Sequence, residues 1–150
     1  MSIRAAEPSD ARAIADLFLA ARSEMTYLPR LHSEDETLAF IRDVVVGELE
    51  AWVLEEEGRV IGFAAMSDEM LEHLYVDPAA QGRGVGSELL ALAKRRRPAG
   101  FRLWVFQKNG AARRFYERHR FVLVELTDGA GNEERVPDAL YEWRPSSHDG

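Results

Sequence analysis

A glycine-rich turn between an expected strand and an expected helix is the segment of this sequence best suited to chemistry. The residues Leu74 to Val76 precede it, and the run from Gln81 to Ser87 contains Gly82, Gly84 and Gly86 at alternate positions. Glycine lets the backbone turn tightly and brings its N–H groups near a ligand. The first turn of the following helix adds unpaired N–H groups and a positive dipole end. The segment therefore predicts an anion site for a phosphorylated cofactor.

The spacing of the glycines separates this turn from two common phosphate-binding loops. It lacks the Gly-Lys-Ser/Thr ending of a nucleotide-hydrolysing P-loop. Its glycines also do not follow the Gly-x-Gly-x-x-Gly order of a dinucleotide-binding fold. Arg83, inside the turn, can supply a mobile positive charge. On the glycines alone, an ordinary flexible loop between a strand and a helix is the alternative.

The turn and the strand before it resemble the acetyl-CoA motif of the GNAT superfamily of N-acetyltransferases. The matching residues are Gln81, Gly84 and Gly86, preceded by Leu74, Val76 and Pro78. The resemblance implies that the turn amides hold the pyrophosphate of CoA, while the strand pairs its backbone with pantetheine. The implied pantetheine contacts are Leu74, Tyr75 and Val76. The implied contacts at the turn are Gln81 and the pyrophosphate-binding run Gly82, Arg83, Gly84, Val85, Gly86 and Ser87.

A second segment carries an asparagine and a tyrosine on either side of a helix start. Asn109 follows an expected strand over Phe101 to Phe106, and Tyr116 lies in the helix expected over Ala111 to His119. Seven residues at about 100° each complete almost two turns, so both can share one side. A tyrosine hydroxyl near the thioester sulfur can protonate the departing CoA thiolate. The alternative for Tyr116 is a core aromatic residue.

This segment is similar to the second conserved stretch of the same superfamily. The resemblance implies that Asn109 contacts the cofactor and that Tyr116 is the general acid. One position departs from the family pattern, because Arg120 stands where the family usually has glycine after the helix. A left-handed conformation at an arginine costs roughly 1 kcal/mol, so the helix either carries that strain or ends in another way.

An acceptor amine must lose a proton before it attacks a thioester. An alkylamine with a pKa of about 10.4 is almost fully protonated at pH 7. Glu72 is the first candidate for the base, directly or through water, because it lies two residues before Leu74 on the expected strand. His73 is the rival, since its ordinary pKa is suitable. For both residues, a solvated or structural role is the alternative.

The alternation of side chains along a strand predicts on which face of the sheet each residue of this expected strand lies. Glu72, Leu74 and Val76 are expected on one face, and Leu71, His73 and Tyr75 on the other. The thioester carbonyl would be stabilised by a backbone N–H of this strand, with Val76 as the expected donor.

Composition narrows the class of protein. The chain has 150 residues, 46% of them hydrophobic and 30% charged, which fits one domain over residues 1–145 with a flexible tail at 146–150. It has no cysteine, which excludes thiolate chemistry, and its 4 histidines are scattered, which argues against a metal site. A net charge of −7 argues against nucleic-acid binding. No apolar run approaches the length of a membrane span, so a cytoplasmic location is expected.

The order of the expected elements predicts a mixed α/β fold. A strand over Ile3 to Ala5 leads to a helix over Asp10 to Glu24, capped by Ser9, and Ser33 opens a second helix toward Val46. An antiparallel meander of three strands follows, and then an alternation of strands and helices. The resemblance implies a central mixed sheet of about seven strands with about four helices.

These observations together predict an acetyl-CoA-dependent N-acetyltransferase. The expected reaction is direct acetyl transfer to a primary amine, of a small molecule or of a peptide or protein, in a ternary complex. The absence of cysteine excludes an acyl-cysteine intermediate. The alternative is a non-catalytic acyl-CoA-binding sensor on the same fold. A homodimer is left open by the sequence.

Overall fold

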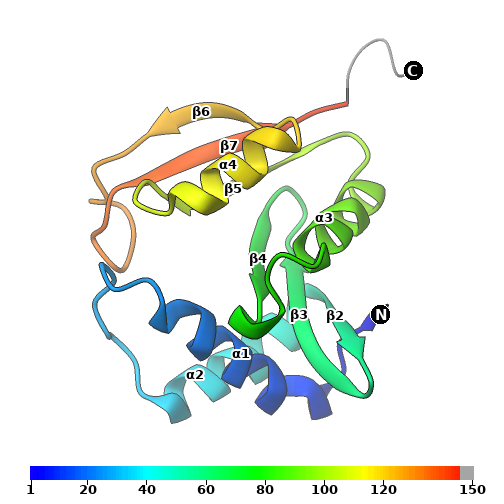
Figure 1. The fold of residues 1–150 in the computed structure, drawn as a ribbon. Coiled ribbons are helices and arrows are strands. Elements are labelled where there is room, and N and C mark those ends of the chain that lie inside the picture. The colour runs from blue at the N-terminus through cyan, green and yellow to red at the C-terminus, as the bar shows by residue number, and fades with distance from the viewer. Residues whose placement is uncertain (146–150) are drawn as a thin grey trace.

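Seven strands form two sheets that lie side by side in the computed structural model, which describes residues 1–145 (Figure 1). The first sheet has the order β1-β2-β3-β4 and is antiparallel throughout. Its strands are β1 (Ser2–Ala5), β2 (Glu50–Glu56), β3 (Arg59–Met66) and β4 (Leu71–Val76). The second sheet has the order β5-β7-β6, built from β5 (Phe101–Phe106), β7 (Asp138–Trp143) and β6 (Val122–Leu126). The predicted mixed α/β class with about seven strands is confirmed.

Alternating apolar residues place helices on both faces of the first sheet. The helices are α1 (Ala11–Ser23), α2 (Glu34–Phe40), α3 (Val85–Arg96) and α4 (Gly110–Arg118), with a π-helical turn at Ile41–Val46 and short 3₁₀ turns at Pro8–Asp10 and Pro78–Ala80. Ile14 of α1 packs with Val53 and Phe63 in one core cluster. Leu89 of α3 packs with Leu54 in the other. Because neighbouring residues of a strand point to opposite faces, one sheet serves both clusters.

The two sheets meet at a single point between β4 and β5. Met70 and Arg102 form an isolated parallel bridge, and the Arg102 amide donates to the carbonyl of Glu69 over 3.0 Å. Within residues 1–145 no further bridge joins these two strands. The strands therefore separate beyond the bridge, and β4 keeps one edge unpaired.

Two local expectations are wrong. Ser9 does not cap the first helix, because a 3₁₀ turn begins at Pro8 and Glu7 forms a capping box with Asp10. Leu71 does not share a face with His73, since the β3–β4 register shifts between Ala65 and Met66. It packs in the same cluster as Leu74 and Val76. The predicted flexible tail at 146–150 lies outside the described residues, within which no helix is long and apolar enough to cross a membrane.

The end of α4 carries the backbone strain that the sequence suggested. Arg120 has φ 72°, a left-handed conformation. Its amide donates to the Glu117 carbonyl over 3.1 Å, and the Phe121 amide donates to the Tyr116 carbonyl over 3.0 Å. This pair of bonds is the arrangement in which helices ordinarily end at glycine.

Replacing Arg120 with glycine should therefore stabilise the protein. We expect Arg120→Gly to raise the free energy of unfolding by about 1 kcal/mol, measured by urea denaturation, because glycine adopts positive φ without strain. Arg118→Gly is the matched control, since Arg118 is in the last turn of α4 and glycine there should lower stability by about 1 kcal/mol. Equal losses in both variants would contradict this explanation.

Candidate active site

The turn between β4 and α3 presents a row of free backbone amides. Asp77 opens it by accepting a hydrogen bond from the Ala79 amide over 2.9 Å. Gly82 and Gly84 have φ 80° and 82°, and Gly84 precedes α3 without a side-chain cap. Within residues 1–145, none of the amides from Gly82 to Ser87 donates a hydrogen bond. Free amides at a helix start are suited to bind an anion, the role expected of this turn from the sequence.

Two glycines bring the start of α3 close to its neighbours. A Cβ on Gly62 of β3 would lie 2.7 Å from Val85 Cγ1, so only glycine lets α3 approach the sheet at this point. A Cβ on Gly86 would lie 3.4 Å from the Phe115 ring of α4. The sequence analysis missed Gly62, although a glycine inside a strand is a signal of close backbone approach. The row of amides is therefore held by packing between α3, β3 and α4.

Arg83 is paired rather than free. One of its Nη atoms lies 2.6 Å from both carboxylate oxygens of Glu56, at the end of β2. The hydrogen bond from Arg83 lowers the pKa of Glu56. Both side chains are partly exposed to solvent, so such a pair contributes little to stability, and Arg83 can exchange Glu56 for another anion.

The open edge of β4 exposes the backbone of two predicted cofactor contacts. The Asp77 amide donates to the Ile61 carbonyl of β3 over 2.9 Å. In an antiparallel pair, alternate residues bond to the partner strand. With Val76 opposite Gly62 and Leu74 opposite Ala64, the N–H and C=O groups of Leu74 and Val76 point away from β3. They face the gap where β4 and β5 separate.

Tyr116 lies in the core cluster that also contains Leu74 and Val76. Its side chain is 8% exposed and packs against the rings of Phe115 and Phe121. Burial raises the pKa of its hydroxyl, with a smaller contribution from Tyr75. The hydroxyl therefore stays protonated at neutral pH, as a general acid must. Asn109 caps α4 by accepting a hydrogen bond from the Ala112 amide over 3.1 Å.

His73 and Tyr75 point to the opposite face of β4. The His73 ring lies within 6.3 Å of the rings of Phe18, Phe40 and Phe63, measured between centroids. Burial lowers the pKa of His73 to about 4, with a smaller contribution from the positive charge of Arg22. A neutral imidazole packed among aromatic rings is a weak base, so this environment favours the structural interpretation of His73.

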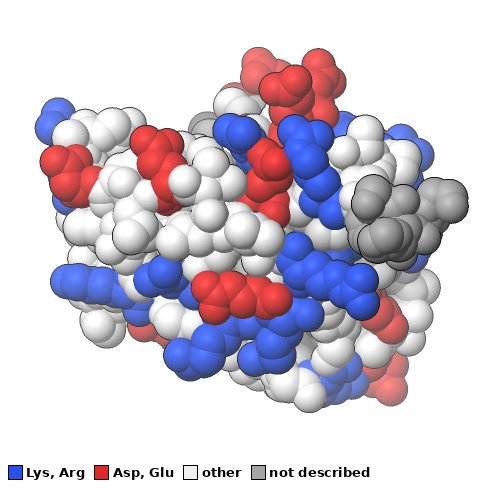
Figure 2. Space-filling model, turned by 90° about the horizontal axis from the view of Figure 1, so that it is seen from above, with Lys and Arg blue, Asp and Glu red and all other residues white. Residues whose placement is uncertain are grey.

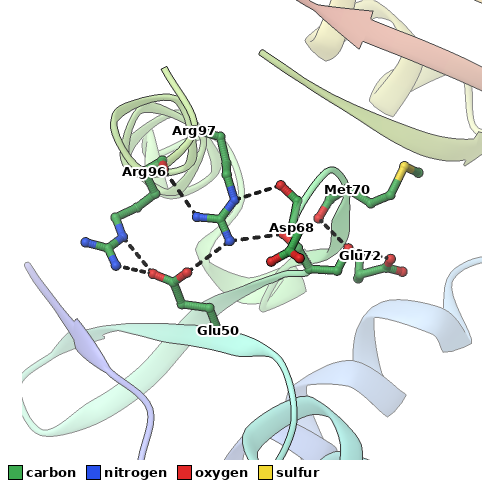
Figure 3. Close-up of polar contacts among 7 residues, drawn as sticks. Glu50, Asp68, Met70, Glu72, Arg96 and Arg97 are labelled. Carbon is green, nitrogen blue, oxygen red and sulfur yellow. Dashed lines mark hydrogen bonds and ion pairs between the residues drawn. The ribbon is translucent and has the colours of Figure 1, made fainter. Parts of the chain in front are cut away.

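Glu72 is exposed at the start of β4 and is held by a neighbouring turn (Figure 3). Its carboxylate accepts a hydrogen bond from Ser67 Oγ over 3.1 Å. Arg97, at the end of α3, donates to the carbonyls of Ser67 and Asp68 over 3.0 and 3.1 Å. The same guanidinium donates to Glu50 of β2 over 3.0 Å. Arg97 therefore holds in place the turn whose Ser67 hydroxyl contacts Glu72.

The basic run at residues 94–97, at the end of α3, makes hydrogen bonds and ion pairs within the protein. Besides Arg97, Arg96 donates to Glu50 over 2.7 Å, and Lys94 donates to the carbonyl of His119 over 2.7 Å. Lys94 also lies over the Trp143 ring, 4.9 Å from its centroid. Figure 2 shows basic and acidic side chains next to one another on the face seen from above. The cationic side chains of Lys94, Arg96 and Arg97 are therefore engaged in contacts within the protein.

A cavity of about 400 Å³ opens along β5 and the loop between β6 and β7. Its walls are Trp104, Val105, Phe106, Thr127, Gly131, Asn132, Glu134 and Asp138. Trp104 is 46% exposed. The Asp138 carboxylate accepts hydrogen bonds from the hydroxyl of Thr127 and the side-chain amide of Asn132. The sequence analysis assigned none of these residues to a site.

The last turn of α1 and the loop after it contact the loop after β6. Arg22 donates to Glu134 over 3.0 Å and to the hydroxyl of Tyr75 over 3.4 Å. His32 and Glu133 form a second contact, which raises the pKa of His32. Two pairs of charged groups thus join segments that are more than a hundred residues apart in sequence.

The residues at the turn and at the unpaired edge fit CoA. The anionic pyrophosphate matches the amides from Gly82 to Ser87, and the amide-bearing pantetheine matches the free backbone of Leu74 and Val76. A Cβ on Gly82 or Gly84 would meet no atom within 4 Å, so there is open space in front of the turn. Acetyl-CoA would bring the acetyl thioester to this gap.

The family model described as "Acetyltransferase (GNAT) domain" matches residues 47–123, half of the chain. The chain therefore belongs to the GNAT acetyltransferase family, and it is an acetyl-CoA-dependent N-acetyltransferase. Nothing in the comparisons favours a non-catalytic sensor.

Relatives of known name cover almost the whole chain. The peptidyl-lysine N-acetyltransferase YiaC of Escherichia coli K12 is 29% identical over 142 residues, 94% of this chain and 95% of the relative. An N-acetyltransferase structure from Staphylococcus aureus Mu50 has 25% identity and a TM-score of 0.74, covering 95% of this chain and 97% of the other. The fold of yncA from Salmonella typhimurium, solved with acetyl-CoA, matches with a TM-score of 0.71 and 24% identity, over 99% and 96% of the two chains.

The glycine turn offers a direct test of cofactor binding. Gly84→Val should weaken acetyl-CoA binding at least tenfold by calorimetry, because a β-branched residue at positive φ displaces the amides that follow it. Gly58→Val is the matched control: Gly58 has φ 76° in the turn between β2 and β3, with equally open space around its Cβ. Both variants should lose stability through strain, but only Gly84→Val should lose affinity. Wild-type affinity in a folded Gly84→Val protein would remove the turn from the cofactor site.

Proposed function

We propose that this enzyme acetylates the amine of a lysine side chain in a peptide or protein, within a ternary complex with acetyl-CoA. The observation that carries the proposal is the cavity along β5, whose wall combines aromatic side chains with Glu134 and Asp138. Trp104 and Phe106 offer surface to a long aliphatic stem, whereas the carboxylate of Glu134 is already paired with Arg22. The similarity to the peptidyl-lysine N-acetyltransferase YiaC supports the same acceptor class.

In the proposed reaction, the neutral amine attacks the thioester carbonyl directly. The N–H of Val76 points into the gap between the sheets and would stabilise the developing oxyanion. The hydroxyl of Tyr116 would donate its proton to the leaving CoA sulfur as the C–S bond breaks. The amine is expected to give its proton to Glu72, directly or through water, because Glu72 extends from the same strand on the solvent side. The products are the acetylated amine and free CoA.

The remaining proposals concern the whole chain. Residues 1–145 would act as one catalytic domain, and the cytoplasm would be its site of action.

The general-acid role of Tyr116 predicts a specific loss in the variant Tyr116→Phe. Turnover should fall by about 10²-fold or more, because only the proton donor is removed. The affinity for acetyl-CoA, measured by calorimetry, should stay within about twofold of wild type. Wild-type turnover in this variant would leave Tyr116 a packing residue of the core.

The base is tested by the pH profile of kcat/KM. A base must be deprotonated to act, so kcat/KM should fall as the pH drops through its pKa. Glu72→Gln keeps the shape of the side chain and should lower activity and flatten this acidic limb. His73→Phe fits the aromatic cluster and should leave the limb unchanged. The reverse pattern would assign the base to His73, and an unchanged profile in both variants would indicate deprotonation by solvent.

A further inference from the structure

The hydroxyl of Tyr27 is buried in the protein without a hydrogen-bond partner. Among the buried side-chain nitrogen and oxygen atoms of residues 1–145, it alone has none. The ring of Tyr27 packs edge-on against Phe106, with 6.0 Å between centroids and an interplanar angle of 72°. Phenylalanine would make the same packing contact without burying a polar atom, so packing does not explain the hydroxyl.

The surroundings of Tyr27 place it at the acceptor side of the site. Phe106 and Glu134 both line the cavity. Arg22 donates to Glu134 and to Tyr75, and both Arg22 and Tyr75 are close enough to Tyr27 to affect the pKa of its hydroxyl. Tyr75 in turn belongs to β4, the strand with the unpaired edge. Tyr27 therefore packs against one wall of the cavity and lies near the two side chains, Arg22 and Tyr75, that link this wall to β4.

A tyrosine hydroxyl can donate one hydrogen bond and accept another. A main-chain peptide group offers a carbonyl to the donor or an N–H to the acceptor. A simple alkylamine has no such group beyond the nitrogen that reacts. A partner that enters only with the acceptor also explains why the hydroxyl has none in the free protein.

We propose that Tyr27 is a specificity-determining residue that hydrogen-bonds a main-chain peptide group of the acceptor, selecting lysine in a peptide over a free alkylamine. This inference rests on the proposed function and adds the group that the enzyme reads beside the reactive amine.

The test compares Tyr27→Phe with wild type on two acceptors: a lysine tripeptide blocked at both ends, and n-butylamine. Both carry a primary amine on a four-carbon chain, but only the tripeptide has peptide groups. We expect KM for the tripeptide to rise about 5- to 10-fold, the usual effect of losing one hydrogen bond, with KM for n-butylamine and for acetyl-CoA unchanged. The free variant should be at least as stable as wild type, because it no longer buries an unpartnered hydroxyl.

Tyr141→Phe is the matched control. The Tyr141 hydroxyl donates to Glu117 over 2.7 Å and accepts from Arg113 over 3.0 Å, so this variant should lose stability but keep KM for the tripeptide. An unchanged KM in Tyr27→Phe, or equal increases for both acceptors, would overturn the inference. If wild type acetylates neither acceptor, the proposed function fails. Calorimetric binding of the tripeptide to the CoA complex then still tests Tyr27, since equal affinity in wild type and Tyr27→Phe would overturn its role.

Discussion

The unpaired edge of β4 is the constraint on which the site depends. Backbone N–H and C=O groups away from water need partners, and those of Leu74 and Val76 have none in β3. The bridge at Met70 holds β4 and β5 together at one end only, so the groups further along remain available. A ligand with amide groups can pair with them as an added strand would. The same separation leaves room for an acceptor between the sheets.

The turn after β4 extends this edge into an anion site without a charged side chain at its centre. The amides from Gly82 to Ser87 are presented by the backbone, and α3 is held against the sheet by the missing side chain of Gly62. Arg83 is occupied by Glu56 in the free protein. Backbone geometry, rather than net charge, would therefore account for phosphate binding at this turn in a protein whose net charge is −7.

The parts of this site that depend on local sequence could be predicted from it. The alternating glycines define the turn, and the strained helix end at Arg120 follows from a residue type in a known position. The acceptor side could not be predicted in the same way. Tyr27 and Phe106 meet only because distant segments fold together, and the face of Leu71 depends on a register shift that strand alternation does not reveal. Whether a polar atom such as the Tyr27 hydroxyl has a partner is a property of the folded protein alone.

Helix α3 touches both ends of the catalytic arrangement. Its first turn adjoins the glycine turn, and Arg97, just after its last residue, fixes the β3–β4 turn from which Glu72 extends. A helix of 12 residues is a stiff rod about 18 Å long. A displacement of the first turn of α3 would therefore also move its last turn, next to which the side chain of Arg97 donates hydrogen bonds to two carbonyls. With the cofactor at the proposed site, its binding and the alignment of the strand that carries Glu72 would thus depend on the same helix.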